Sequence, residues 1–267
     1  MRSPRPPFLS SAGAVRTPAA VIEEPFQRFA GFPVRAFVTT RRGGVSEPPF
    51  DSLNVAYLTD DRRENVRENR ERVAAALEVA HDELLIGRQV HGGQVKRAED
   101  VVLGETPGDG ILLTRAGTAA MIVAADCLPL IFYDPRAHTG LVAHAGWRGL
   151  AAGVIENGIA TLVSAGATPS EVIVGLGPAI GRCCYEVGPE VIAAVEPIEG
   201  EYDPGKGDRS MLDLKAIARR RLRECGIDPG KVEDLALCTR CRQDLYYSAR
   251  GGEPTGRFAA GLKLLKG

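Results

Sequence analysis

The sequence lacks the features that most readily assign a protein to a functional class. Its formal net charge is −1, so no basic excess favours a nucleic acid or an anionic membrane surface as partner. No apolar run is long enough to span a bilayer. The chain has no Walker sequence, and Gly175-Leu-Gly177 lacks the remaining glycine of a dinucleotide-binding loop. We therefore expect neither a nucleic-acid partner nor a membrane partner.

Composition along the chain predicts a tail followed by one domain. The first 25 residues are expected to be disordered, and they lack the continuous apolar centre of a signal peptide, which favours a cytoplasmic protein. Residues 26–267 contain no internal repeat or clear linker, which predicts a single α/β or α+β domain. Six cysteines, two of them adjacent at Cys183 and Cys184, do not form the pattern of a secreted disulfide framework. Reduced thiols are expected.

Hydrophobic periodicity predicts an alternation of strands and helices. Strands are expected at residues 33–39, 84–87, 111–113, 119–127, 130–133, 141–145, 171–176, 235–238 and 259–265. Helices are expected from 61 to about 79, from 147 to about 166, from 189 to about 195, and from 213 to about 226. Asp61 and Asp213 are the expected N-caps of two of these helices. Residues 197–210 are expected to form a polar loop.

The stretch from Thr139 to Leu150 combines a buried strand, a glycine-rich turn and a helix start. His144 lies at the end of the strand, on a rigid element. Gly146 and Gly149 allow a close approach of the backbone. The free N–H groups of the helix start, together with the charge of Arg148, favour an anion such as phosphate.

Three predicted strand ends carry His91, Cys127 and His144. Imidazole and thiolate are zinc ligands, and three protein ligands with an open fourth position are typical of catalytic zinc. Other interpretations stay open. Cys127 can be a core residue beside two hydrogen-bonded histidines, or a nucleophile with His144 as its base. The same donors also suit copper, with Met121 as a weak axial ligand.

A second cysteine motif, Cys238-Thr-Arg-Cys241, has the spacing of a metal-binding pair. No second cysteine pair lies at the sequence spacing of a zinc finger. We therefore favour the interpretation that these two cysteines pack in the fold or are incidental free thiols.

Together these motifs resemble the laccase-domain family, also called multicopper polyphenol oxidases or purine nucleoside phosphorylase-like proteins, which includes peptidoglycan editing factors. The matching segments follow family order after residue 35: Thr40-Arg-Arg-Gly-Gly-Val-Ser46, Ser52-Leu-Asn54, Gln89-Val-His91-Gly92, Gly108-Asp-Gly110, Ala125-Asp-Cys-Leu-Pro129, His144-Ala-Gly-Trp-Arg-Gly149, Gly177-Pro-Ala-Ile180, Tyr185-Glu-Val-Gly188 and Cys238-Thr239. The resemblance implies a three-layer α-β-α fold with a mixed sheet. It also implies a zinc ion, with copper as a second choice, held by His91, Cys127 and His144.

The activities implied by the resemblance are phosphorolysis of purine nucleosides (adenosine, inosine and methylthioadenosine) and deamination of adenosine, by a monomer or homodimer. Arg148 is expected to hold the phosphate. Arg250 is expected to face the same pocket, although its segment, Tyr246-Tyr-Ser-Ala-Arg250, departs from the family pattern. Asp109 and Asp126 are the nearest candidates by motif for a general acid or base.

Alternative functions remain at this point. Four histidines are too few for the copper centres of a true multicopper oxidase, so we expect no such activity. A hydrolase that edits cell-wall precursors would use Cys127 as nucleophile. A binding protein with a purely structural zinc is the non-enzymatic alternative.

Overall fold

The computed structural model describes residues 21–266. The first 20 residues of the predicted tail therefore lie outside the described chain. The next five are placed, and Glu23 pairs with Val38 through backbone hydrogen bonds of 2.8 and 2.9 Å. The described chain thus includes five residues that precede residue 26, where the predicted domain begins.

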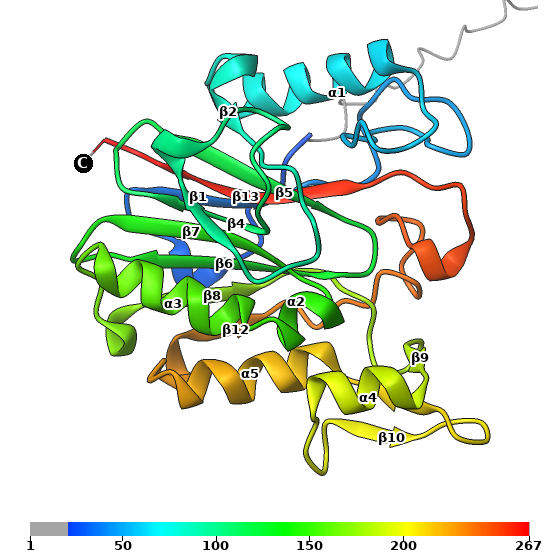
Figure 1. Cartoon of the computed structure of the whole chain (residues 1–267). Coiled ribbons are helices and arrows are strands. Elements are labelled where there is room, and N and C mark those ends of the chain that lie inside the picture. Colours follow the sequence, from blue (N-terminus) through cyan, green and yellow to red (C-terminus); the bar gives the residue numbers. More distant parts are fainter. Residues whose placement is uncertain (1–20, 267) are drawn as a thin grey trace, which may run out of the picture.

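Two stacked β-sheets form the centre of the molecule (Figure 1). The first has the strand order β1-β13-β5-β2, the second has the order β12-β8-β6-β7-β4-β3, and a small third sheet has the order β10-β11-β9. The strands are β1 (Val34–Val38), β2 (Leu84–Leu85), β3 (Val95–Arg97), β4 (Gly110–Leu113), β5 (Ala119–Ala124), β6 (Leu128–Asp134), β7 (Thr139–Ala145), β8 (Ile173–Leu176), β9 (Glu186–Val187), β10 (Tyr202–Pro204), β11 (Ser210–Leu212), β12 (Val232–Asp234) and β13 (Phe258–Leu264). Both large sheets contain parallel and antiparallel pairs.

Helices cover the outer faces of the two sheets. The α-helices are α1 (Arg63–Ala76), α2 (Trp147–Ala151), α3 (Val154–Ser164), α4 (Pro189–Val195) and α5 (Leu214–Glu224). Short 3-10 helices lie at η1 (Gln27–Phe29), η2 (His81–Glu83), η3 (Ala98–Asp100), η4 (Pro169–Glu171), η5 (Pro229–Lys231) and η6 (Ala249–Gly251). Helix α1 lies on the four-stranded sheet, whereas α3 packs on β7 and α5 packs on α3 (Figure 1). No helix among residues 21–266 has the length and apolar character needed to cross a membrane.

The apolar core lies between the sheets and under the helices. Ile122 of β5 and Val142 of β7 belong to one buried cluster that joins the two sheets. A second cluster joins the outer face of the six-stranded sheet to α3 and α5. The predicted mixed α/β class is confirmed, and the middle of the fold consists of two stacked sheets where the α-β-α expectation had one layer.

Several predicted helix starts are correct. Asp213 caps α5 by accepting hydrogen bonds from the backbone N–H groups of Lys215 and Ala216 at 3.1 and 2.9 Å. Helix α4 starts at Pro189 and ends at Val195, as expected.

Asp61, by contrast, does not cap α1. One of its carboxylate oxygens binds Ser46 and Asn54, at 2.7 and 2.8 Å. Its other oxygen accepts only from the adjacent Arg62 N–H among the described contacts. The capping-box prediction was wrong because this carboxylate serves a loop network instead of the helix end.

The helix predicted from 147 to about 166 is two helices. Gly153 has a φ of 74°, a left-handed conformation that interrupts the helical hydrogen bonds between α2 and α3. Its backbone N–H bonds to Leu150 O at 2.9 Å. Helix α2 therefore has only five residues.

Two secondary-structure predictions in the C-terminal half of the chain are also wrong. The strand expected at 235–238 lies three residues earlier, as β12, and Ala236 has a left-handed φ of 52° that ends the extended conformation. The loop expected at 197–210 contains β10, which pairs with β11 as a hairpin.

We expect Gly261→Ala to destabilise the fold, because a Cβ there would collide with the carbonyl oxygen of Ala120 and the ring of Phe37. Overpacking of this kind lowers the free energy of unfolding by about 1–3 kcal/mol. The matched control is Gly158→Ala in α3, where the nearest atom to an added Cβ is a Leu141 methyl at 3.6 Å. That change should raise it by about 0.5–1 kcal/mol. Urea unfolding measures both, and equal effects would contradict the packing.

Candidate functional site

The structure brings together the three residues predicted as metal ligands. One donor atom from each of His91, Cys127 and His144 lies within 4.8 Å of the others. The two imidazole rings meet edge to face, with centroids 4.9 Å apart and an interplanar angle of 79°. His91 lies in the turn after β2, Cys127 immediately precedes β6, and His144 lies in β7. Because β6 pairs with β7 with Pro129 opposite His144, sheet register brings the thiol and this imidazole together.

Asp109, which is fully buried, supports two of these residues. Its carboxylate accepts hydrogen bonds from the backbone N–H groups of Val90, His91 and Gly92 at 3.1, 3.0 and 2.7 Å. It also contacts Nδ1 of His144 at 2.9 Å. Burial raises the pKa of Asp109, but the hydrogen bonds from His144 and Gly92 outweigh it and hold the pKa below its usual value. The turn that carries His91 and the ring of His144 are thus fixed by one carboxylate.

The protonation states of Cys127 and His144 are linked. Burial disfavours the Cys127 thiolate, but the charge of His144 and hydrogen bonds from both histidines lower the thiol's pKa to about 6. Burial also disfavours the His144 imidazolium, but the thiolate and the Asp109 carboxylate raise its pKa to about 9. In metal-free protein near neutral pH the two side chains therefore form a thiolate–imidazolium pair.

The backbone of the site adopts uncommon conformations. His91 has a φ of 57° and Asp126 a φ of 95°, both in the left-handed region that non-glycine residues rarely occupy. Gly146 lies against the thiol, since a Cβ there would be 2.7 Å from Sγ of Cys127. Such strain persists only where surrounding contacts impose it, and it is typical of functional sites.

Asp126, the residue before Cys127, contacts the C-terminal part of the chain. Its carboxylate accepts a 2.6 Å hydrogen bond from the hydroxyl of Thr239 and a 2.8 Å bond from the backbone N–H of Arg250. Its carbonyl accepts from the N–H of Ile180 at 2.9 Å. Three segments that are distant in sequence therefore meet beside Cys127.

A cavity of about 440 Å³ opens onto the three donor residues. Three arginines line it: Arg148, Arg250 and Arg257. The guanidinium of Arg148 lies 4.3 Å from the ring centroid of Trp147. That of Arg250 lies 5.1 Å from the ring centroid of Tyr185. The cavity thus combines the donor set with positive charge and two aromatic walls.

The predicted site residues occupy two kinds of position. Asp126, Arg148 and Arg250 line the cavity, as do the three donor residues. Asp109 is not among the lining residues and acts from behind His144.

Tyr185, Gln89 and Arg257 are among the lining residues that were not predicted from the sequence. Tyr185 lies within a motif that carried the family resemblance but was given no role there. Gln89 lies two residues before His91, and its side chain bonds to the backbone of Val123 at 2.8 and 2.9 Å. Arg257 had no local signal, because β13 and the segment before it reach the site only through the tertiary fold.

A family model described as multi-copper polyphenol oxidoreductase laccase matches residues 35–265. The chain belongs to this family. A purine nucleoside phosphorylase of Pseudomonas aeruginosa is 41% identical to it, over 85% of this chain and 92% of the relative. The purine nucleoside phosphorylase YfiH of Escherichia coli is 33% identical, over 87% of this chain and 94% of the relative.

Solved structures of similar proteins share the fold. YlmD from Geobacillus stearothermophilus aligns with a TM-score of 0.84 and 31% identity, over 90% of this chain and 94% of that one. A YfiH protein from Bacillus licheniformis aligns with a TM-score of 0.81 and 33% identity, over 87% and 93%.

We expect Cys127 of the metal-free protein to react with iodoacetamide with a midpoint near pH 6, following its pKa of about 6. The rate should rise through this pH because the thiolate is the nucleophile. His144→Ala removes the main favourable charge and should raise the midpoint by roughly one pH unit or more. Peptide mass spectrometry measures the rate at each cysteine.

Cys225 is the internal control for this titration, because burial raises the pKa of its thiol. A midpoint for Cys127 equal to that of Cys225 would rule out the thiolate–imidazolium pair.

Proposed function

We propose that this protein is a zinc-dependent purine nucleoside phosphorylase acting on adenosine, inosine or methylthioadenosine with phosphate. The observation that carries the proposal is the His/Cys/His donor set opening on an arginine-lined cavity. Relatives named purine nucleoside phosphorylase, at 41% and 33% identity, support the same reaction.

The donor set suits zinc. His91, Cys127 and His144 offer two imidazoles and one thiol with a low pKa, and nitrogen and thiolate sulfur are preferred zinc ligands. The contact of Asp109 with His144 is the carboxylate–histidine support typical of zinc sites. Copper accepts the same donors and is the second choice. When bound, the metal supplies Lewis acidity that polarises or orients a reactant.

We assign phosphate binding to the arginines of the cavity. Phosphorolysis forms a bond from a phosphate oxygen to the anomeric carbon, breaks the bond to the purine nitrogen and leaves that electron pair on the purine. Arg148 and Arg250 offer guanidinium donors that match phosphate oxygens and balance their charge. Helix α2 has five residues, so the side chains contribute more than the helix dipole that the sequence suggested.

The departing purine needs a hydrogen-bond donor while negative charge develops on it. Tyr185 is our candidate, because it lines the cavity beside Arg250, whose guanidinium lies 5.1 Å from its ring centroid. Burial and the neighbouring Cys127 thiolate raise its pKa to about 12. The phenol therefore keeps its proton at neutral pH and can donate it to a hydrogen bond.

We assign positioning roles to the two carboxylates proposed as general acid or base. The oxygens of Asp109 already accept from three backbone N–H groups and contact His144. Those of Asp126 already accept from Thr239 and Arg250. These partners hold the donor set and the Arg250 segment in place.

Adenosine deamination is a second candidate reaction of the same cavity. Three protein donors leave a fourth zinc position for a reactant, which suits hydrolytic chemistry as well as phosphorolysis. Cell-wall editing with Cys127 as nucleophile and a purely structural metal are the competing functions, and both predict no phosphate dependence. Among the described residues, the possible metal clusters contain two histidines, too few for a multicopper oxidase.

The central test measures purine release from adenosine and inosine by zinc-loaded protein, with and without phosphate. We expect phosphate-dependent release that is lost in His144→Ala and in His91→Ala, the latter altering an exposed residue. Ammonia release from adenosine is measured in parallel. No release with zinc bound, or equal release without phosphate, would overturn phosphorolysis.

Arg148→Ala is expected to raise the KM for phosphate by roughly 10–100-fold, the value of a charge-assisted hydrogen bond, while changing the KM for the nucleoside little. Arg136→Ala is the control, because this exposed arginine lies outside the cavity and makes a 3.8 Å ion pair with Glu171. Initial rates at varied phosphate measure the effect. Unchanged phosphate KM in Arg148→Ala would remove this residue from the anion site.

Asp109→Asn is expected to raise the free zinc concentration for half-maximal activity by about 10–100-fold, as other losses of a carboxylate behind a ligating histidine do. Activity at saturating zinc should recover, because Asp109 does not line the cavity. Asp82→Asn, at an exposed position, is the control. Activity lost at every zinc concentration would assign Asp109 a chemical role instead.

A further inference from the structure

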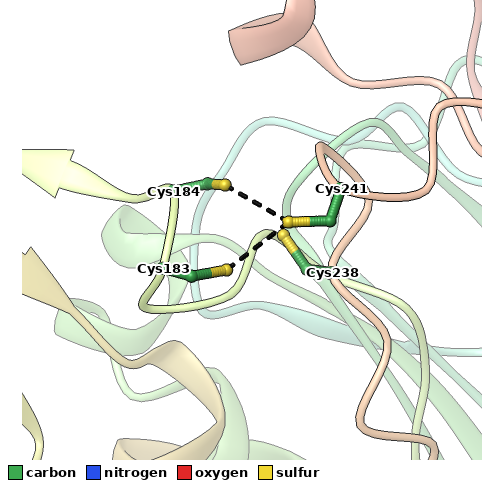
Figure 2. A group of neighbouring side chains, drawn as sticks. All are labelled: Cys183, Cys184, Cys238 and Cys241. Carbon is green, nitrogen blue, oxygen red and sulfur yellow. Dashed lines mark hydrogen bonds between the residues drawn. The ribbon is translucent and has the colours of Figure 1, made fainter.

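Four cysteines gather outside the His/Cys/His site. Cys183 and Cys184 lie in the segment between β8 and β9, and Cys238 and Cys241 lie after β12 (Figure 2). The Sγ atoms of Cys183 and Cys184 are 3.7 and 3.5 Å from that of Cys241. All four sulfurs lie within 4.8 Å of one another. All are free thiols.

The spacing of this cysteine cluster fits a single metal ion. A tetrahedral ion with metal–sulfur bonds of about 2.3 Å separates its sulfurs by about 3.8 Å. A disulfide requires about 2.05 Å. An iron–sulfur cluster places several iron atoms between its cysteines and separates them more widely. The sulfur separations of 3.5 and 3.7 Å match the first arrangement.

Backbone hydrogen bonds support thiolate formation at the C-x-x-C turn. The N–H of Gly181 donates to Sγ of Cys238 at 3.2 Å, and the N–H of Cys241 also points to this sulfur. These donors face the sulfur of a residue that the fold already places beside the other three cysteines.

We propose that Cys183, Cys184, Cys238 and Cys241 form a second, structural metal site, a zinc tetrathiolate independent of the His/Cys/His centre. Thiolates are soft ligands and four of them close the coordination shell, which is the arrangement of a structural zinc. Binding replaces the thiol protons, which pass to solvent, with bonds to zinc and involves no oxidation or reduction.

This tetrathiolate site joins one segment that lines the cavity to another that contacts a lining residue. Tyr185 directly follows Cys184 and lines the cavity. Thr239 directly follows Cys238 and donates its hydroxyl to Asp126 beside Cys127. A metal that ties the cysteines together thus fixes the position of both neighbours.

Metal content separates the two sites. Protein saturated with zinc, freed of excess metal and measured by mass spectrometry of the elements, should contain about two zinc ions per chain. Cys183→Ser with Cys241→Ser should retain about one, and His144→Ala should also retain about one. Cys225→Ala, which removes the cysteine outside both groups, should retain both.

Spectroscopy of the bound metal tests whether the second ion has four sulfur ligands. Cobalt-loaded His144→Ala should show the intense visible and charge-transfer absorption of tetrahedral thiolate coordination, and X-ray absorption of its zinc form should show four sulfurs at about 2.3 Å. The His144→Ala variant keeps all four cysteines, so this measurement can be made even if the double serine variant fails to fold. Zinc removal should also lower the Tm of His144→Ala by several degrees.

Two outcomes would overturn the second site. One is a His144→Ala protein that folds but binds no metal with four sulfurs. The other is freshly purified protein that contains a disulfide within the cysteine cluster and no metal there. Failure of phosphorolysis with an intact tetrathiolate would contradict the proposed function alone.

Discussion

The carboxylate of Asp109 meets four donors: three successive N–H groups in the turn that carries His91, and the ring of His144 in β7. A buried carboxylate without such partners would cost several kcal/mol, so its surroundings must form together. The backbone adds a 2.7 Å bond from His144 N–H to the carbonyl of Asp109. The left-handed φ of His91 follows from this arrangement, since three consecutive N–H groups must converge on one side chain. The geometry of both imidazoles therefore depends on one buried acid.

The register of the paired strands also positions the residues of the site. Pairing of β6 with β7 and of β7 with β4 sets the ends of three strands at one edge, so that Cys127, His144 and Asp109 meet there. A one-residue slip would turn His144 to the other face of the sheet, and the buried core on both faces prevents it. The stability of the double-sheet core and the geometry of the site thus rest on the same register.

Local patterns in the sequence were sufficient for what local interactions decide. The cap at Asp213, the start of α4 at Pro189 and most strands followed from short-range rules. The grouping of His91, Cys127 and His144 was one of several interpretations of residues that follow or end predicted strands, and the structure brings the three together. Gly153 separates α2 from α3, and the side chain of Asp61 bonds to a loop instead of capping α1. Both features depend on tertiary contacts that no local pattern contains. The cysteine cluster was missed for the same reason: the partner of the C-x-x-C pair is an adjacent pair more than 50 residues earlier, outside finger spacing.

A short covalent and hydrogen-bonded path connects the two cysteine-containing sites. Cys127 follows Asp126, Asp126 accepts a 2.6 Å bond from Thr239, and Thr239 follows Cys238. Both Asp126 and Thr239 are buried, where water competes little for this charge-assisted bond. A shift of the C-x-x-C turn would therefore displace Asp126, the residue before Cys127. The backbone of Asp126 already has a left-handed φ of 95°. The N–H of Arg250 shares the same carboxylate, so that shift would also move a cavity arginine. A structural ion at the cysteine cluster would accordingly keep Cys127 and Arg250 in fixed positions relative to each other.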